Sequence, residues 1–167
     1  GDVVLNEIFW MGSNAGGSDG PRDEWLELRN TTAKPFKIGS FSLDVSGGGA
    51  ASSTLVLNGV GNTVNSEVLE AEWVFLIARF GDEAKTAFLS TPEVVAPGIS
   101  LPNPGSTTPV TIVLKNGAGT VLDSAVITTD KTWCGENGAD LGVGNDRSME
   151  RNDVPGIGTV GTNWHTA

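Results

Sequence analysis

Apolar residues occur in short runs along the chain, separated by clusters of Gly, Asn, Pro and Ser. Short runs rich in Val, Ile, Leu, Phe and Trp are typical of β-strands, and helical periodicity is nearly absent. The runs predict strands at Val3–Trp10, Glu24–Asn30, Phe41–Val45, Thr54–Leu57, Trp73–Arg79, Val110–Leu114, Thr120–Ile127 and Arg147–Arg151. The pattern therefore predicts an all-β fold, an antiparallel β-sandwich of about seven to nine strands.

The segments between these runs predict the connections. Asn116-Gly117 stands between two apolar runs and predicts a β-hairpin, in which these two residues tolerate a positive φ. Asp82–Ser90 predicts a turn or two of helix. Gly12–Arg22 and Ser46–Ser53 consist mainly of small residues that cannot fill a core, so we expect mobile surface loops. Pro92–Pro109 contains five prolines and is predicted to cover a sheet edge.

Composition limits the classes of partner. The 167 residues fit a single domain over the whole chain, and the net charge of −10 disfavours nucleic acid and anionic lipid surfaces. No apolar run is long enough for a membrane span, so no membrane insertion is expected. The lone Cys134 cannot form an internal disulfide, and with one His the chain lacks a structural zinc set. The many Gly, Ser and Thr residues and the acidic pI favour a secreted or cell-surface protein.

Several motifs carry a family resemblance. They are Val3–Ile8, Asp23–Asn30, Phe41–Leu43, the Asn116-Gly117 hairpin with Val121–Ser124, Arg147–Arg151, and Asn163–His165. In this order and spacing they resemble the lamin tail domain family, in its bacterial form. The resemblance implies an immunoglobulin-like β-sandwich over residues 1–167. It also implies a non-enzymatic accessory or interaction module, and it assigns no catalytic residues.

Polar residues inside apolar strands indicate a fastening of the fold. Asn6 and Glu7 interrupt the first strand, so at least one of them should point inward and need a partner. Arg151 and Arg29 are the candidate partners. We expect a structural polar clasp formed by Asn6, Glu7, Glu27 and Arg151, in which a guanidinium pairs with a carboxylate and ties the two chain ends together.

Two acidic loops could supply oxygen ligands to Ca²⁺. Asp19 and Asp23 lie in the first loop, and Asp140 and Asp146 in the second. Neither loop has the regular spacing of a calcium-binding loop, so solvated acidic loops are the simpler interpretation, and no cofactor is expected.

Five tryptophans without a tyrosine suggest sugar binding as an alternative function. Trp25 and Trp73 lie in strand patterns and are expected in the core, whereas Trp10, Trp133 and Trp164 stand near strand ends and could face a ligand. The leading prediction is an interaction module that binds a protein or a cell-envelope component, possible glycans included. The alternatives are a carbohydrate-binding module and a small hydrolase that uses strand carboxylates such as Glu7, Glu24 or Glu27.

Overall fold

A computed structural model describes residues 1–10, 12, 23–81, 90–102, 108–128 and 147–167. These residues form an all-β structure with thirteen strands and a single short 3₁₀ turn at Gly161–Asn163. No helix in this part of the chain is long and apolar enough to cross a membrane. Residues 82–89 of the predicted helical turn Asp82–Ser90, and residues 13–22 of the predicted loop Gly12–Arg22, lie outside the described residues.

The larger sheet has seven strands in the order β13-β12-β1-β2-β8-β9-β6. In chain order these are β1 (Val3–Phe9), β2 (Trp25–Asn30), β6 (Thr63–Val64), β8 (Val74–Ala78), β9 (Val94–Val95), β12 (Met149–Arg151) and β13 (Trp164–Thr166). Its strand pairs are antiparallel except β8 with β9, which is parallel, so the sheet is mixed.

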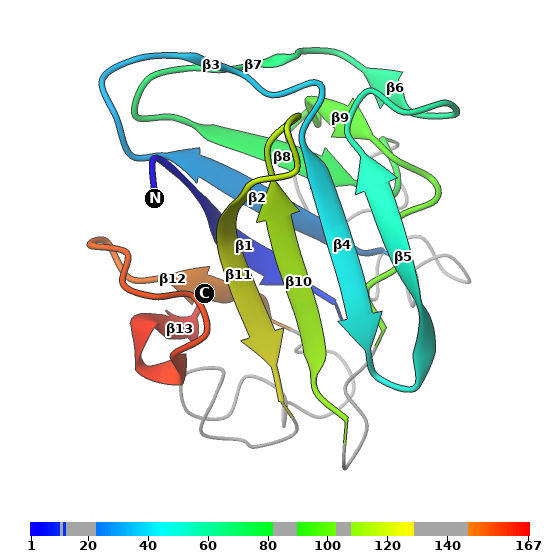
Figure 1. The fold of residues 1–167 in the computed structure, drawn as a ribbon, viewed down its shortest axis with the longest axis vertical. Coiled ribbons are helices and arrows are strands. Elements are labelled where there is room, and N and C mark those ends of the chain that lie inside the picture. Colours follow the sequence, from blue (N-terminus) through cyan, green and yellow to red (C-terminus); the bar gives the residue numbers. More distant parts are fainter. Residues whose placement is uncertain (11, 13–22, 82–89, 103–107, 129–146) are drawn as a thin grey trace.

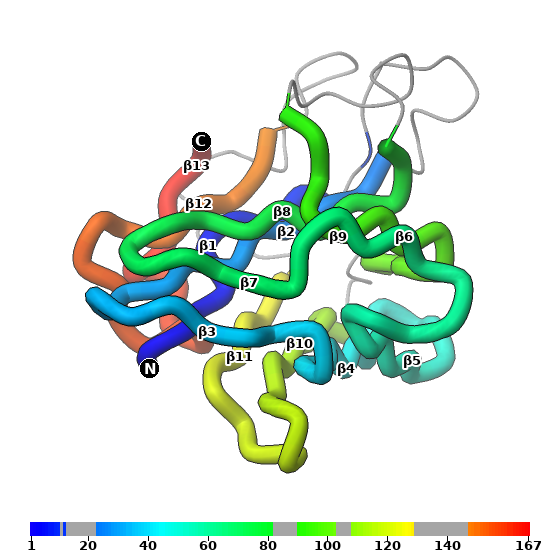
Figure 2. Tube along the Cα trace, turned by 90° about the horizontal axis from the view of Figure 1, so that it is seen from above, coloured from blue at the N-terminus to red at the C-terminus, as the bar shows by residue number. Residues whose placement is uncertain are grey.

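The second sheet has four antiparallel strands in the order β11-β10-β4-β5. They are β4 (Ser42–Gly47), β5 (Ala50–Val56), β10 (Val110–Lys115) and β11 (Val121–Ile127). A small two-stranded sheet joins β3 (Phe36–Lys37) to β7 (Val68–Leu69). The four-stranded sheet lies in front of the larger sheet in Figure 1, and the view from above in Figure 2 shows the two as separate layers.

The core lies between the two main sheets. One cluster of buried apolar side chains takes Leu5, Ile8 and Leu28 from the larger sheet, and Leu43 and Ile112 from the smaller one. Burial of this kind is the main stabilising contribution, about 25 cal/mol for each Å² of apolar surface removed from water. The alternation of buried and exposed residues along β2, β4 and β10 explains why these strands could be predicted from sequence.

Three predictions about connections need correction. Ser46–Ser53 is not a loop, because it contains the end of β4, a glycine turn with Gly47, Gly48 and Gly49 at positive φ, and the start of β5. Pro92–Pro109 contributes β9 to the larger sheet, between β8 and β6, instead of only covering an edge. The hairpin between β10 and β11 is confirmed, but its positive φ belongs to Gly119 and not to Asn116 or Gly117.

Candidate functional site

The two faces of the larger sheet differ in chemistry. Met149 and Arg151 of β12 are buried on the inner side, and Leu26 and Leu28 of β2 belong to the core cluster. Because side chains alternate along a strand, Glu150 and Glu27, which lie between these pairs, point to the opposite, outer face. The outer face therefore carries carboxylates where the inner face carries the core.

Three glutamates lie directly opposite one another on neighbouring strands of this outer face. Glu7 of β1 is the register partner of Glu150 on β12 and of Glu27 on β2. His165 of β13 pairs with Glu150 at one end, where its Nε2 lies 3.4 Å from Glu150 Oε2. We call Glu150, Glu7 and Glu27 the glutamate row. Like charges that face each other across strands destabilise a sheet, so the row needs an explanation.

Polar neighbours contact two members of the row. The Ser148 hydroxyl donates a hydrogen bond to Glu7 Oε1. Asn6 occupies a bulge in β1, where the register shifts between Leu5 and Glu7, and its Nδ2 donates to Glu27 Oε2 at 3.4 Å. Asn6 is 3% exposed, and its Oδ1 has no hydrogen-bond partner among the described residues. The carboxamide that supports Glu27 therefore also holds a buried acceptor that is not satisfied.

The row is electrostatically strained. Burial raises the pKa of Glu7 to about 7, the Ser148 hydrogen bond lowers it, and the charges of Glu27 and Glu150 raise it further. Burial also raises the pKa of Glu27, where the Asn6 hydrogen bond opposes the shift and Glu150 and Glu93 add to it. The folded protein therefore disfavours the charged forms of two adjacent glutamates.

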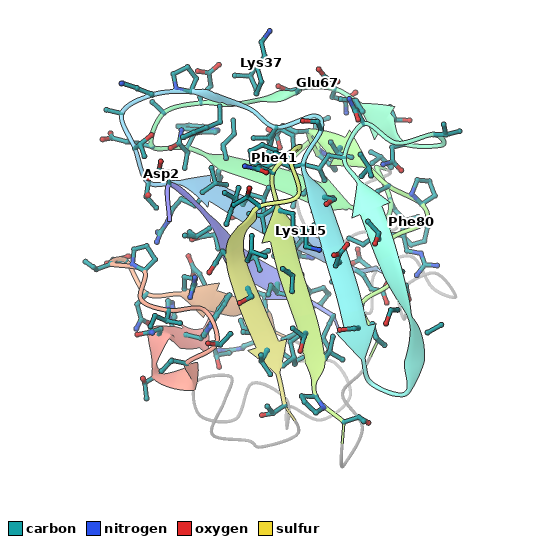
Figure 3. All side chains as sticks on the ribbon, viewed as in Figure 1. Asp2, Lys37, Phe41, Glu67, Phe80 and Lys115 are labelled. Atoms are coloured by element: carbon teal, nitrogen blue, oxygen red, sulfur yellow. The ribbon has the colours of Figure 1, made fainter. Side chains whose placement is uncertain are left out.

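Most described basic side chains have other partners or point elsewhere. Arg29 lies two residues from Glu27 on β2, yet its Nη2 donates to the carbonyl oxygens of Asn152 and Asp153. Lys115 forms an ion pair of 2.5 Å with Asp44 on the four-stranded sheet, where Figure 3 shows it beside β4. Figure 3 also shows Lys37 projecting from β3 away from both main sheets. Among the described residues, His165 is the basic group that contacts the row.

The inner side holds a different polar cluster, centred on Arg151. Its side chain is fully buried, and Nη2 donates to Asp123 Oδ2 at 2.7 Å while Nε donates to the Leu5 carbonyl at 3.3 Å. Asp123 Oδ2 also accepts from the Leu5 backbone N–H at 2.9 Å. The Trp164 ring lies 4.6 Å from the guanidinium. Because Asp123 lies on β11, this cluster joins the two main sheets, and we call it the inter-sheet clasp.

The predicted clasp was therefore correct in its arginine and wrong in its carboxylate. Arg151 pairs with Asp123 and not with Glu7 or Glu27. The reason is the strand alternation, because Glu7 faces Glu150 across the register and so lies on the side of the sheet opposite to Arg151. Asn6, Glu7 and Glu27 belong together instead: Glu7 and Glu27 are neighbours of like charge, Asn6 donates a hydrogen bond to Glu27, and none of the three is the partner of a guanidinium.

The calcium candidates receive no support in the described part of the chain. Asp23 is 1% exposed, and Asp19, Asp140 and Asp146 lie outside the described residues. Among the residues that the structure describes, no group of three or more His, Cys, Asp or Glu side chains could hold a metal ion. That statement includes the glutamate row.

The tryptophans are placed differently from the prediction. Trp10 and Trp164 are each 3% exposed, so neither presents a face to a ligand, and Trp133 lies outside the described residues. Trp73, expected in the core, is 63% exposed. Trp25 stacks on Phe9 with ring centroids 5.4 Å apart. The sequence pattern failed at Trp73 because this residue stands just before β8 begins, where strand alternation no longer determines burial.

Two important residues were missed at the level of sequence. Asp123 interrupts the apolar run of β11 in the same way that Glu7 interrupts β1, and this shared signal could have identified it. Glu150 could not be placed beside Glu7 without the strand register, which short-range patterns do not contain. Glu24, one of the proposed hydrolase carboxylates, is buried and forms an ion pair with Arg79 at 2.8 Å.

Comparison with known proteins assigns neither a family nor a function to this chain. No model of a protein family matches this chain. No curated protein matches it either.

Proposed function

We propose that the chain is a non-enzymatic interaction module of an exported or cell-surface protein, built as an immunoglobulin-like sandwich of the lamin-tail type. The two layers around one core, the motif order and the acidic, glycine-rich composition support this proposal. The module binds a protein or a cell-envelope component. Its net charge of −10 disfavours nucleic acid as that partner.

The glutamate row is the observation that carries the proposal. Three carboxylates at facing positions reduce the stability of the free protein, and burial makes the ionisation of Glu7 and Glu27 harder still. Natural sequences retain such local conflicts mainly at functional sites. No Lys or Arg side chain among the described residues pairs with the row, so a partner that brings a positive charge would relieve the conflict.

The chemistry of the row indicates the class of group that it binds. The row offers carboxylate oxygens, which accept hydrogen bonds, and the Oδ1 of Asn6 beside them is buried and has no hydrogen-bond partner among the described residues. The arrangement does not suit a metal ion, as described above. The remaining class of ligand group carries a positive charge and several hydrogen-bond donors. In a protein partner, such a group is the side chain of Lys or Arg.

Binding of a lysine-containing peptide tests this function. The probe is a twelve-residue peptide of alternating Lys and Ser, titrated calorimetrically into the protein at pH 8 and low salt. The double variant Glu7→Gln/Glu27→Gln should bind about tenfold more weakly, since roughly 1.4 kcal/mol of binding energy corresponds to that factor.

The matched control is Glu67→Gln/Glu70→Gln, which removes the same charge from two exposed glutamates outside the row. It should weaken binding less than threefold, because only the long-range field changes. Equal losses in the two double variants, or no binding of the peptide by the unaltered protein, would contradict the proposed site.

A hydrolase is the second candidate, and one observation favours it. A carboxyl group with a pKa of about 7, as in Glu7, is suited to general acid–base catalysis near neutral pH, and Glu27 lies opposite to it. Turnover of chromogenic esters or glycosides that disappears in Glu7→Gln would favour this candidate over the binding module. The carbohydrate-binding alternative is weakened, because Trp10 and Trp164, two of the three tryptophans expected to face a sugar, are buried.

A further inference from the structure

The four-stranded sheet ends at β5, and the outer edge of this strand has no strand partner among the described residues. Open edges are usually protected by charged side chains or proline, because they can pair with another chain. β5 has neither, and no charged residue occurs anywhere between Val45 and Ser66. Every residue of β5 except the half-buried Leu55 is exposed.

The register identifies the backbone groups that point outward from β5. Leu57 N donates to Phe41 O at 3.0 Å, so the hydrogen-bonded pairs with β4 continue at Leu55 and Ser53. Thr54 and Val56 lie between these pairs, and their N–H and C=O groups therefore point away from β4. The carbonyl of Val56 already accepts from Gly59 N at 2.9 Å and from Asn62 Nδ2 at 3.0 Å. Both backbone groups of Thr54 and the N–H of Val56 remain open toward the described part of the chain.

Apolar side chains lie beside this open edge. Val56 is 40% exposed and Val60 is fully exposed. Together with Leu55 and Pro97 they line a hollow of about 440 Å³ next to β5. A strand added at this edge would gain backbone hydrogen bonds and would also cover exposed apolar surface.

We propose that a second copy of this chain occupies the edge, with β5 paired antiparallel to β5 of the other copy. In a pair centred on Thr54, the open N–H and C=O of each Thr54 bond to those of the other copy. Ser53 then lies opposite Leu55, and Ser52 opposite Val56, so no charge meets a like charge across the two-fold axis.

The charge distribution permits this occupant and predicts how the pair depends on salt. Two copies of net charge −10 repel each other at long range, but the strands that meet in this pair are uncharged. Salt screens charges over a length of about 8 to 10 Å at ordinary ionic strength, so the pair should strengthen as salt increases. Binding of a cationic peptide to the glutamate row should weaken under the same change, which separates the two surfaces experimentally.

Sedimentation velocity over a series of protein concentrations, in low salt and in 1 M NaCl, tests the proposal. The unaltered protein should show a monomer–dimer equilibrium that shifts toward dimer in high salt. Thr54→Pro removes the outward N–H and leaves the β4–β5 hydrogen bonds in place, so it should weaken dimerisation at least tenfold. Thr54→Val is the control. Both variants lose the hydrogen bond of 2.7 Å from the Thr54 hydroxyl to Asp44, but only Thr54→Val keeps the backbone N–H, so it should dimerise like the unaltered protein.

Thr54→Glu provides a second variant if the proline variant fails to fold. It keeps the N–H and places two further negative charges near the axis, so it should also weaken dimerisation at low salt. A protein that stays monomeric at every concentration and salt level would overturn the proposal. Dimers of equal strength in the unaltered protein and in the folded Thr54→Pro or Thr54→Glu variants would overturn it as well.

Discussion

Glu150 and Arg151 are neighbours on β12, yet they belong to opposite kinds of polar region. Arg151 points inward, where its charge is matched by Asp123. Its Nη2 and Nε donate to a carboxylate and a carbonyl oxygen, whereas its Nη1 is buried without a hydrogen-bond partner among the described residues. Glu150 points outward into a row of like charges. The inter-sheet clasp is a buried ion pair that holds two sheets together, whereas the glutamate row costs stability. The comparison suggests that a charge matched by an opposite charge marks residues that hold the fold, whereas like charges set against each other mark residues kept for a partner.

Breaking the inter-sheet clasp should have the largest effect on stability. Arg151→Met leaves the Asp123 carboxylate mostly buried without its cation and the Leu5 carbonyl without its Nε donor. Removing one member of a buried ion pair costs about 3–5 kcal/mol of unfolding free energy. Urea denaturation followed by tryptophan fluorescence measures the loss.

Arg147→Met is the matched control, because Arg147 lies four residues earlier and is exposed. It should change the free energy of unfolding by less than about 0.5 kcal/mol. Similar losses of unfolding free energy in Arg151→Met and Arg147→Met would contradict the stabilising role of the inter-sheet clasp.

Relieving the glutamate row should have a smaller effect of the opposite sign. The pKa of Glu7 rises from 4.5 to about 7 on folding, so the folded state holds the proton more tightly, and stability falls as pH increases from about 4.5 to 7. Glu7→Gln removes this charge and can still accept from Ser148. Because Glu7 is partly exposed, we expect a gain of about 1–2 kcal/mol at pH 8 and almost none at pH 4.

Unfolding free energies measured from pH 4 to pH 9 would test this expectation, with Glu70→Gln as the exposed control. The Glu7→Gln curve should be flatter than that of the unaltered protein. A variant that is destabilised at pH 8 would show that the charged Glu7 helps to hold the fold.

The same comparison explains what the sequence could predict. The alternation of apolar residues was sufficient for β1, β2, β4, β8, β10 and β11, because each of these strands buries one face or both in the core. It failed at Ala50–Ser53, where small exposed residues form an edge strand held by backbone hydrogen bonds, which hydropathy does not report.

The polar residues were recognised, but their partners were not. A polar residue in an apolar strand indicates a special environment, and Asn6, Glu7 and Arg151 were identified in this way. Deciding that Glu7 faces Glu150 while Arg151 faces Asp123 needs the register between strands far apart in sequence. The sequence could therefore identify the individual polar residues of the site, but not which of them lie beside one another.

Carbon-13 NMR titration of the Glu7 side-chain carboxyl, with and without the lysine–serine peptide, tests the central claim most directly. In the free protein the carboxyl should titrate with a pKa of about 7, and saturating peptide should move this pKa downward, because a nearby cation favours the charged form. A Glu7 carboxyl that titrates near 4.5 in the free protein, or one whose titration the bound peptide leaves unchanged, would contradict the claim that the row is an uncompensated binding surface.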